Sequence, residues 1–217
     1  MSAQPPTAQG LLACVGSVLL LAGCVTTAPQ VTSGWFQHAS LMQARAGLDL
    51  FYWDPAFRPQ EYDALLVAKP ELPSPRPRHF YLRHLDEEFQ QRLREHVQVL
   101  RLVPQVTTDP AEVAAHARVL VLDTQFTELT HGDQVQRWWF GEFGAGNTFI
   151  ELRGRLIDPA MGTSFVEFAD RRRGAAVLDI MGGDSEQLIR EDLRGILDDL
   201  TQTLRAAHHE TTGGVTP

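Results

Sequence analysis

Hydrophobic and polar residues alternate along the chain with two different periods. Between residues 82 and 100, apolar side chains recur at steps of three and four; they are Leu82, Leu85, Phe89, Leu93, Val97 and Leu100. A second stripe of this kind ends at Leu204 and follows Asp184, which is a candidate N-cap. Steps of three and four place side chains on one face of a helix, so the sequence predicts two amphipathic helices.

Four other segments have the composition or the alternation of β-strands. Thr148 to Asp158 alternates between mostly aliphatic and mostly charged residues, as expected for a strand with one buried face. Asp158 to Gly162 has turn residues, and Thr163 to Arg172 is the predicted return strand. Residues 63–68 and 117–129 are rich in aliphatic and β-branched residues and predict two further strands.

The predicted elements follow one another in the order β-α-β-β-β-α. We therefore predict an α+β fold, with a single antiparallel sheet of about four strands and two helices packed on one face. The α+β domain is expected to span residues 61–207, because its first strand begins near Tyr62. Residues 208–217 are polar and are predicted to form a disordered tail.

Two aromatic clusters are candidate binding surfaces. Residues 24–60 begin as a small, polar tether and then become too aromatic for a free linker. We interpret this part as an arm packed across the domain, or alternatively as an arm that binds a partner through Trp35 and Phe36. In the domain, Trp138-Trp139-Phe140 has adjacent aromatic residues, which in a strand point to opposite faces. These rings either contact a partner or pack at an edge against the arm.

Residues 1–23 have features of an export signal. The apolar run from Gly10 to Gly23 is shorter than the about 20 residues of a membrane-spanning helix. It ends in Leu21-Ala22-Gly23-Cys24, which resembles the lipobox of bacterial lipoproteins. The resemblance implies cleavage between Gly23 and Cys24 and attachment of lipid to the Cys24 thiol. Residues 1–9 lack the usual Lys or Arg, and the alternative is a buried apolar helix that ends in a cysteine.

The residue after Cys24 indicates which membrane would hold the lipid. It is Val25 rather than Asp. By resemblance to the sorting rule of enteric bacteria, Val25 favours the outer membrane, with the domain facing the periplasm. Two or three acyl chains anchor a protein stably, so the membrane is an expected partner through the lipid on Cys24.

The charge and cysteine content exclude some functions and bonds. The 217 residues include 19 Lys and Arg and 27 Asp and Glu, a formal charge of −8. A nucleic-acid-binding protein needs a basic face, so we expect no nucleic-acid partner. Cys14 lies in the leader and would be removed with it. The mature chain would then keep only Cys24 and could form no internal disulfide.

Residues with catalytic or metal-binding chemistry are scattered along the sequence. The eight histidines form no HExxH pair or His/Cys cluster, and no Gly-x-Ser-x-Gly motif is present. Gly141 to Gly146 is followed by a predicted strand rather than a helix, which favours a turn over a phosphate loop. Arg171-Arg172-Arg173 is interpreted as a solvated turn that caps a strand at the surface, or as a contact for lipopolysaccharide phosphate or a phosphorylated partner. We expect no enzyme activity, catalytic residues, metal, cofactor or small-molecule substrate.

Several short motifs occur in the order found in a known family. They are the lipobox, Ser33-Gly34-Trp35-Phe36 followed by Ser40-Leu41, Tyr62 to Val67, Gly141 to Gly146, Asp158 to Gly162, and Gly182-Gly183-Asp184. The chain thereby resembles a proteobacterial lipoprotein family of unknown function, domain of unknown function thirty-three thirteen, which is related to forty-four ten. The resemblance implies an outer-membrane lipoprotein that faces the periplasm, and it supplies no catalytic residues.

Three functional hypotheses follow. The first is a non-catalytic accessory or scaffold lipoprotein that binds a protein partner of the cell envelope. The alternative is a module that binds lipid, lipopolysaccharide or peptidoglycan. The third is an envelope hydrolase whose carboxylates or histidines meet only in the folded chain.

Overall fold

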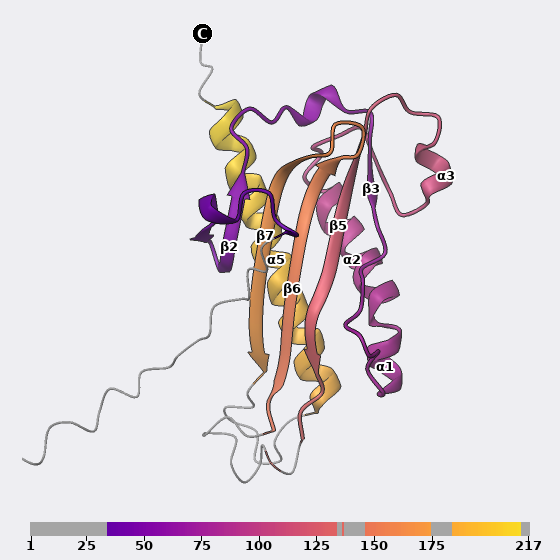
Figure 1. Ribbon diagram of the computed structural model, residues 1–217, viewed down its shortest axis with the longest axis vertical. Helices are drawn as coiled ribbons and strands as arrows, with labels where there is room; N and C mark the ends of the chain where they lie inside the picture. Colours follow the sequence, from indigo (N-terminus) through magenta and orange to yellow (C-terminus); the bar gives the residue numbers. More distant parts are fainter. Residues whose placement is uncertain (1–33, 134–135, 137–145, 175–183, 214–217) are drawn as a thin grey trace, which may run out of the picture.

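The computed structural model describes residues 34–133, 136, 146–174 and 184–213, and these form one β-sheet with helices on one side (Figure 1). In chain order the elements are η1 (Ala39–Leu41), β1 (Gln43–Arg45), β2 (Leu48–Trp53), η2 (Pro59–Glu61), β3 (Ala64–Val67), α1 (Phe80–Arg83), α2 (Leu85–Gln98), β4 (Gln105–Thr107), α3 (Pro110–Val113), β5 (Val119–Thr130), β6 (Thr148–Asp158), β7 (Thr163–Gly174) and α5 (Ser185–Thr212).

The sheet is larger than predicted and it is mixed. Its seven strands lie in the order β1-β2-β7-β6-β5-β3-β4. The strands β3–β4 and β3–β5 pair in parallel, whereas the pairs β1–β2, β2–β7, β5–β6 and β6–β7 are antiparallel. The prediction of an antiparallel sheet of about four strands with two helices was therefore wrong, since the described residues contain seven strands and four α-helices.

The parallel part of the sheet follows from the helical connections. After β3 the chain passes through α1 and α2 before it forms β4, and then through α3 before it forms β5. A helical crossover returns the chain to the end of the sheet from which it started, so that the next strand runs parallel. The predicted β-α-β order contained this information, but the antiparallel prediction did not use it.

The long antiparallel hairpin of β6 and β7 forms the centre of the sheet, as the alternation predicted. Gly154 pairs with Phe168 across the two strands, and Phe168 is fully buried. A Cβ atom at Gly154 would overlap the Phe168 ring, so glycine leaves the space that the ring occupies. Asp158 closes the turn, because its carboxylate accepts hydrogen bonds from the amides of Ala160 and Met161.

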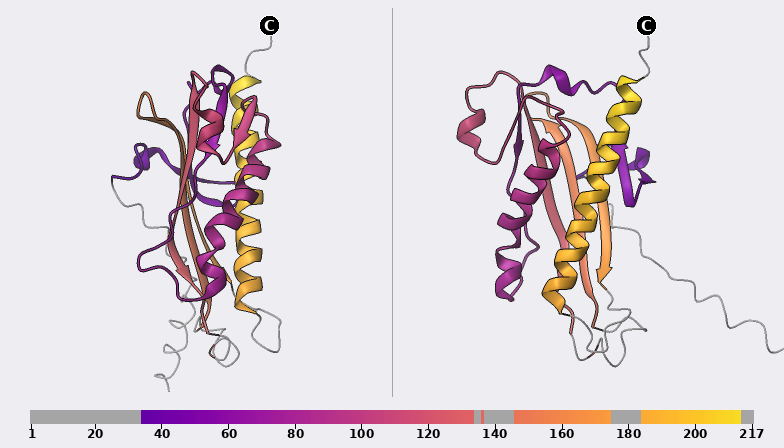
Figure 2. Two further views of the ribbon diagram at one scale, coloured as in Figure 1. Left: turned by 90° about the vertical axis from the view of Figure 1, so that its right-hand side faces the viewer. Right: turned by 180° about the vertical axis from the view of Figure 1, so that it is seen from behind.

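The two long helices cover one face of the sheet (Figure 2). The predicted N-cap of α5 is confirmed, because the Asp184 carboxylate accepts a hydrogen bond from the Glu186 amide at 3.0 Å. The apolar stripes of both helices are buried in one core with the inward side chains of the strands. We call the opposite side of the sheet the helix-free face.

The two ends of the described chain extend the domain beyond its predicted limits. Residues 43–53, predicted to be part of an arm, form the hairpin β1–β2 and join the sheet through β7. At the other end, α5 continues to Thr212, so the boundary predicted at residue 207 is too early. None of the described helices combines the length and hydrophobicity needed to cross a membrane.

Candidate functional site

Some of the predicted site residues lie among the residues that the structure describes, and others lie outside them. Gly23, Cys24 and the cluster Trp138-Trp139-Phe140 lie outside the described residues, so their proposed roles stay predictions. Trp35 and Phe36 are described, and both lie on the helix-free face. We use the name arm for residues 34–42 from here on.

Trp35 and Phe36 are both used for packing within the chain. The ring of Trp35 lies 4.5 Å from the guanidinium carbon of Arg153 and 4.6 Å from that of Arg155. Arg155 Nη1 also donates a hydrogen bond to the Trp35 carbonyl oxygen at 3.1 Å. Phe36 is only 7% exposed and packs with Met42 and Ala169 in a small second core. Phe36 therefore has little surface left with which to contact a partner.

The arm is fixed to β7 by a buried carboxylate. Glu167 has no solvent exposure, and its two oxygens accept hydrogen bonds from the amides of Gln37 at 2.7 Å and His38 at 2.9 Å. The Gln37 side chain accepts from the Ser164 amide and donates to the Gly162 carbonyl oxygen. A buried carboxylate needs such partners, because an unpaired charge in the interior is costly.

Sequence reasoning did not identify Glu167. It occupies a polar position in a strand with an alternating pattern, and such positions normally face solvent. Its partners lie about 130 positions earlier in the chain, so no local pattern links them. The aromatic arm could have indicated a residue such as Glu167, because the backbone amides of the arm need a polar partner wherever the arm packs.

The charges of the helix-free face are paired between different strands, and one pair spans β6. Arg155 of β6 contacts Asp123 of β5 through two nitrogens, at 3.0 and 2.9 Å. Arg171 of β7 contacts Glu128 of β5 at 2.7 Å. Burial lowers the pKa of the Arg153 guanidinium, and the positive charge of Arg155 lowers it further. The negative face of the Trp35 ring lies beside both cations and offsets part of this repulsion.

The arginine run of β7 does not form a phosphate-binding turn. Arg171, Arg172 and Arg173 lie within the strand, so that adjacent side chains point to opposite faces. Arg172 contacts Asp170 and Asp199, both at 2.6 Å, on the side of the sheet that α5 covers. The interpretation of this run as a surface turn was therefore wrong.

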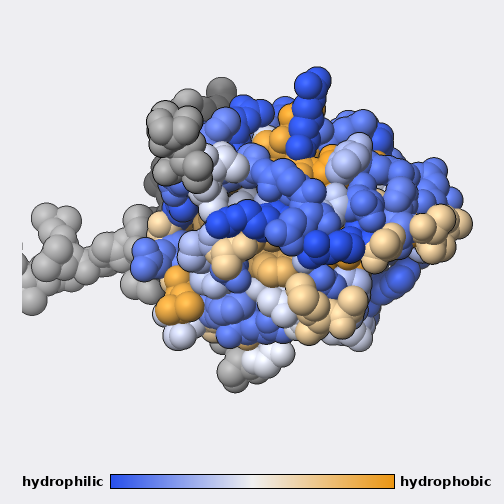
Figure 3. Space-filling view, turned by 90° about the horizontal axis from the view of Figure 1, so that it is seen from above, coloured by the Kyte–Doolittle hydropathy of each residue, from blue (hydrophilic) through white to orange (hydrophobic). Residues whose placement is uncertain are grey.

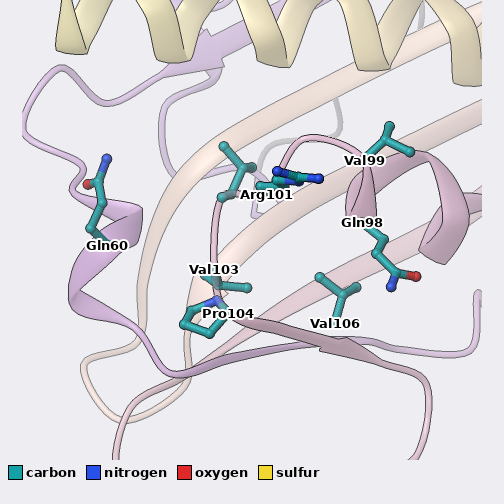
Figure 4. A pocket seen from close by; sticks show the side chains of 8 residues that line it. Gln60, Gln98, Val99, Arg101, Val103, Pro104 and Val106 are labelled. Carbon is teal, nitrogen blue, oxygen red and sulfur yellow. The ribbon is translucent and has the colours of Figure 1, made fainter.

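A shallow pocket lies at the edge of the sheet, where α2 ends and β4 begins (Figure 4). Its volume is about 730 Å³, and it is lined by Gln60, Gln98, Val99, Arg101, Leu102, Val103, Pro104 and Val106. Arg101, three residues beyond the end of α2, has a φ of 52°, a left-handed conformation that residues other than glycine adopt at a cost. The Arg101 guanidinium has no ion-pair partner among the described residues, and no acidic residue lines the pocket.

Two histidines stack beside a second hollow of about 590 Å³. The rings of His79 and His131 are 3.8 Å apart and nearly parallel. Burial lowers the pKa of His79, and a positive charge on His131 would lower it further. His131 Nδ1 lies 3.0 Å from the Gly132 carbonyl oxygen, so this nitrogen donates a hydrogen bond and is not free to act as a base. No group of three His, Cys, Asp or Glu side chains that could hold a metal occurs in the described part of the chain.

The comparisons with known proteins give a family match for part of the chain. Residues 77–177, just under half of the sequence, match a family model described as a domain of unknown function (DUF4410). A search of curated proteins finds no significant match.

Two solved structures align with about 70% of this chain at low sequence identity. The PelC dodecamer subunit from Paraburkholderia phytofirmans is 13% identical, with a TM-score of 0.45 over 70% of this chain and 93% of that chain. A minor lipoprotein from Acinetobacter baumannii is 14% identical, with a TM-score of 0.33 over 72% of this chain and 98% of that one. Similarity at this level supports no functional conclusion. The family match supports an uncharacterised family, and the assignment to family thirty-three thirteen and to proteobacteria stays a prediction.

Proposed function

We propose that this protein is a non-catalytic accessory lipoprotein of the bacterial cell envelope that binds a protein partner there. The observation that carries the proposal is the sequence Leu21-Ala22-Gly23-Cys24. Ten residues after Cys24 the chain reaches the arm, which is bound tightly to the domain. A lipid on Cys24 would therefore hold a folded domain close to the membrane surface. The residue Val25 supports the outer membrane, with the domain in the periplasm.

The lipid anchor is tested by substituting each of the two cysteines. With Cys24→Ala we expect the chain to leave the membrane fraction of cells, because no thiol remains to accept lipid. Cys14→Ala is the matched control, since it leaves the lipobox intact and should keep the protein on the membrane. Mass spectrometry of the mature amino terminus should find an acylated Cys24. A Cys24→Ala chain that stays as membrane-bound as the parent would refute the proposal.

The partner is tested by crosslinking in intact cells. We expect specific products that contain the lipoprotein and a second envelope protein. The cluster Trp138-Trp139-Phe140 is the remaining aromatic candidate for the contact, because Phe36 is buried in the arm. Substituting the three aromatic residues by alanine should then remove the products. Crosslinking that captures only the free monomer would contradict an accessory role.

The pocket at the end of α2 favours a second candidate function, in which the domain binds lipopolysaccharide or another anionic amphiphile. Pockets for such ligands are mostly apolar with a few polar groups, and Arg101 lies beside a mainly apolar lining without an ion-pair partner among the described residues. Lipopolysaccharide binding to the purified lipoprotein should then weaken with Arg101→Glu. The same substitution at Arg194, an exposed arginine of α5, is the control and should not weaken it. Equal binding by both variants would exclude this site.

A further inference from the structure

We propose that the helix-free face of the sheet is turned toward the bilayer, with the side chains of Leu41 and Met161 in contact with lipid. This inference rests on the proposed attachment of lipid to Cys24. It goes further because it states how the domain is oriented on the membrane and which side chains touch it.

The length of the chain between the lipid and the arm limits the distance of the domain from the membrane. Cys24 and Gly34 are ten residues apart. A fully extended chain of this length spans at most about 35 Å, and a relaxed flexible one has an end-to-end distance of roughly 18 Å. The membrane surface must therefore lie within about 35 Å of Gly34.

The arm lies over the middle of the sheet. Trp35 lies over Arg153 and Arg155 of β6, and β6 is the fourth of the seven strands. With strands about 4.8 Å apart, either edge of the sheet is about 14 Å away. A chain that passes around that edge to the outer side of the helices needs roughly 15 Å more, because it must also cross the helix layer and the side chains beneath it.

Together these distances decide which side can face the membrane. A path from the arm to the helix-covered side is roughly 30 Å long, close to the limit of about 35 Å. The helices could face the bilayer only if the connecting residues were almost fully stretched, which has a high entropic cost. The helix-free face requires no stretching, because the arm already lies on it.

Exposed hydrophobic side chains are found near the arm. Among the described residues, three large hydrophobic side chains are exposed: Leu41 at 57%, Met161 at 59% and Val99 at 62%. Leu41 ends the short helix of the arm, and Met161 lies in the β6–β7 turn, which the Gln37 side chain binds at Gly162. Val99 instead lies at the end of α2, in the helix layer.

The arm and the β6–β7 turn are the parts that a membrane on this side would meet. In the side view of Figure 2, both project from the sheet away from the helices. Seen from the end that carries this turn, the surface is mainly hydrophilic with small, separate apolar patches (Figure 3). Two isolated apolar side chains at projecting points suit shallow insertion into a lipid surface better than a protein interface, which needs a continuous packed core.

The orientation can be measured with a fluorescent label at single cysteines. Cys14 would be removed with the leader and the Cys24 thiol would carry lipid, so an introduced cysteine is the free thiol of the mature chain. Leu41→Cys and Met161→Cys report on the proposed contacts, and Val99→Cys is the matched control with similar exposure. Each lipidated full-length variant is labelled with an environment-sensitive dye and reconstituted into vesicles of phosphatidylethanolamine and phosphatidylglycerol.

We expect labels at positions 41 and 161 to be quenched several-fold more strongly by a lipid-attached quencher than the label at 99. Aqueous iodide should show the reverse order. If the protein floats with the vesicles and a label at 41 or 161 is as accessible to iodide as the one at 99, the orientation is wrong. Stronger lipid quenching at 99 than at 41 and 161 would overturn the orientation, because it would place the lipid at the end of α2, where Val99 lines the pocket. A protein that does not float with the vesicles would contradict the lipid anchor itself and remove the basis of this inference.

Discussion

The carboxyl group of Asp192 makes the stability of this domain depend on pH in a predictable direction. Asp192 lies on α5, beside Gly174 and Thr148. Its Oδ2 atom is buried and has no hydrogen-bond partner among the described residues. Burial raises the pKa of Asp192 from 3.8 to about 6, opposed by the positive charge of Arg172. At neutral pH the folded protein therefore holds an ionised carboxylate at a partly buried position, which disfavours the charge.

The sign of the effect follows from the number of bound protons. Between about pH 4 and pH 6 the folded state holds a proton on Asp192 that the unfolded state has lost, so this group's contribution to stability falls as pH rises. A pKa change of this size corresponds to about 3 kcal/mol at pH 7. Solvent still reaches part of the side chain, which reduces the expected cost to roughly 1–3 kcal/mol.

The substitution Asp192→Asn removes the charge and keeps the shape. We expect the free energy of unfolding at about pH 7 to increase by roughly 1–3 kcal/mol, and that at about pH 4 to stay nearly unchanged. Urea unfolding of both proteins across this range measures the difference. Asp198→Asn is the control, because the Asp198 side chain is 63% exposed on the same helix, and we expect a change below about 0.5 kcal/mol. An Asn variant that is equally or less stable at neutral pH would refute the reasoning.

Substitutions at four further positions test the packing, the helix α5, the turn and the arm. Gly154→Ala should destabilise the domain by about 1–3 kcal/mol in urea unfolding, because the new methyl group overlaps the buried Phe168 ring. Gly195→Ala on α5 should instead stabilise by up to about 1 kcal/mol, since its Cβ meets an arginine side chain at an ordinary 3.4 Å. Ala46 begins a two-residue hairpin turn with a φ of 46°, and Ala46→Asn should stabilise by about 0.5–1 kcal/mol in thermal unfolding. Glu167→Ala should leave two arm amides without an acceptor and increase their hydrogen exchange by about tenfold or more, whereas Glu167→Gln should have a smaller effect.

The sequence predicted the elements whose signal is local. The bounds of β6 agree with the alternating segment from Thr148 to Asp158, and the predicted N-cap of α5 is confirmed. In these elements, residues two to four positions apart lie on the same side of the strand or helix, so the local pattern shows which side is buried. The strands that were missed have weaker local signals. β1 and β4 have three residues each, too short for any period to appear.

The arrangement in space was harder to predict because it depends on distant residues. Residues 43–53 form a hairpin of the sheet, but they were predicted to belong to the aromatic segment 24–60 that packs across the domain. Aromatic composition cannot distinguish a strand that joins a sheet from a segment that lies across it. The arm-binding site joins Trp35 to Arg153 and Arg155, and the Gln37 and His38 amides to Glu167. These contacts join segments that lie far apart in the sequence, so only the folded chain shows the site.

If Cys24 carries lipid as proposed, the arm would link the stability of the fold to its orientation on the membrane. While the arm is bound, the part of the chain between Cys24 and the domain is ten residues long, and the helix-covered side would be almost out of reach. If the arm detached up to β1 at Gln43, that part would grow to about nineteen residues with a reach of roughly 65 Å, and either side of the sheet could face the bilayer. The buried contacts of Glu167 would then do more than stabilise residues 37 and 38. By keeping the tether short, they would determine which face of the domain a partner in the envelope can reach.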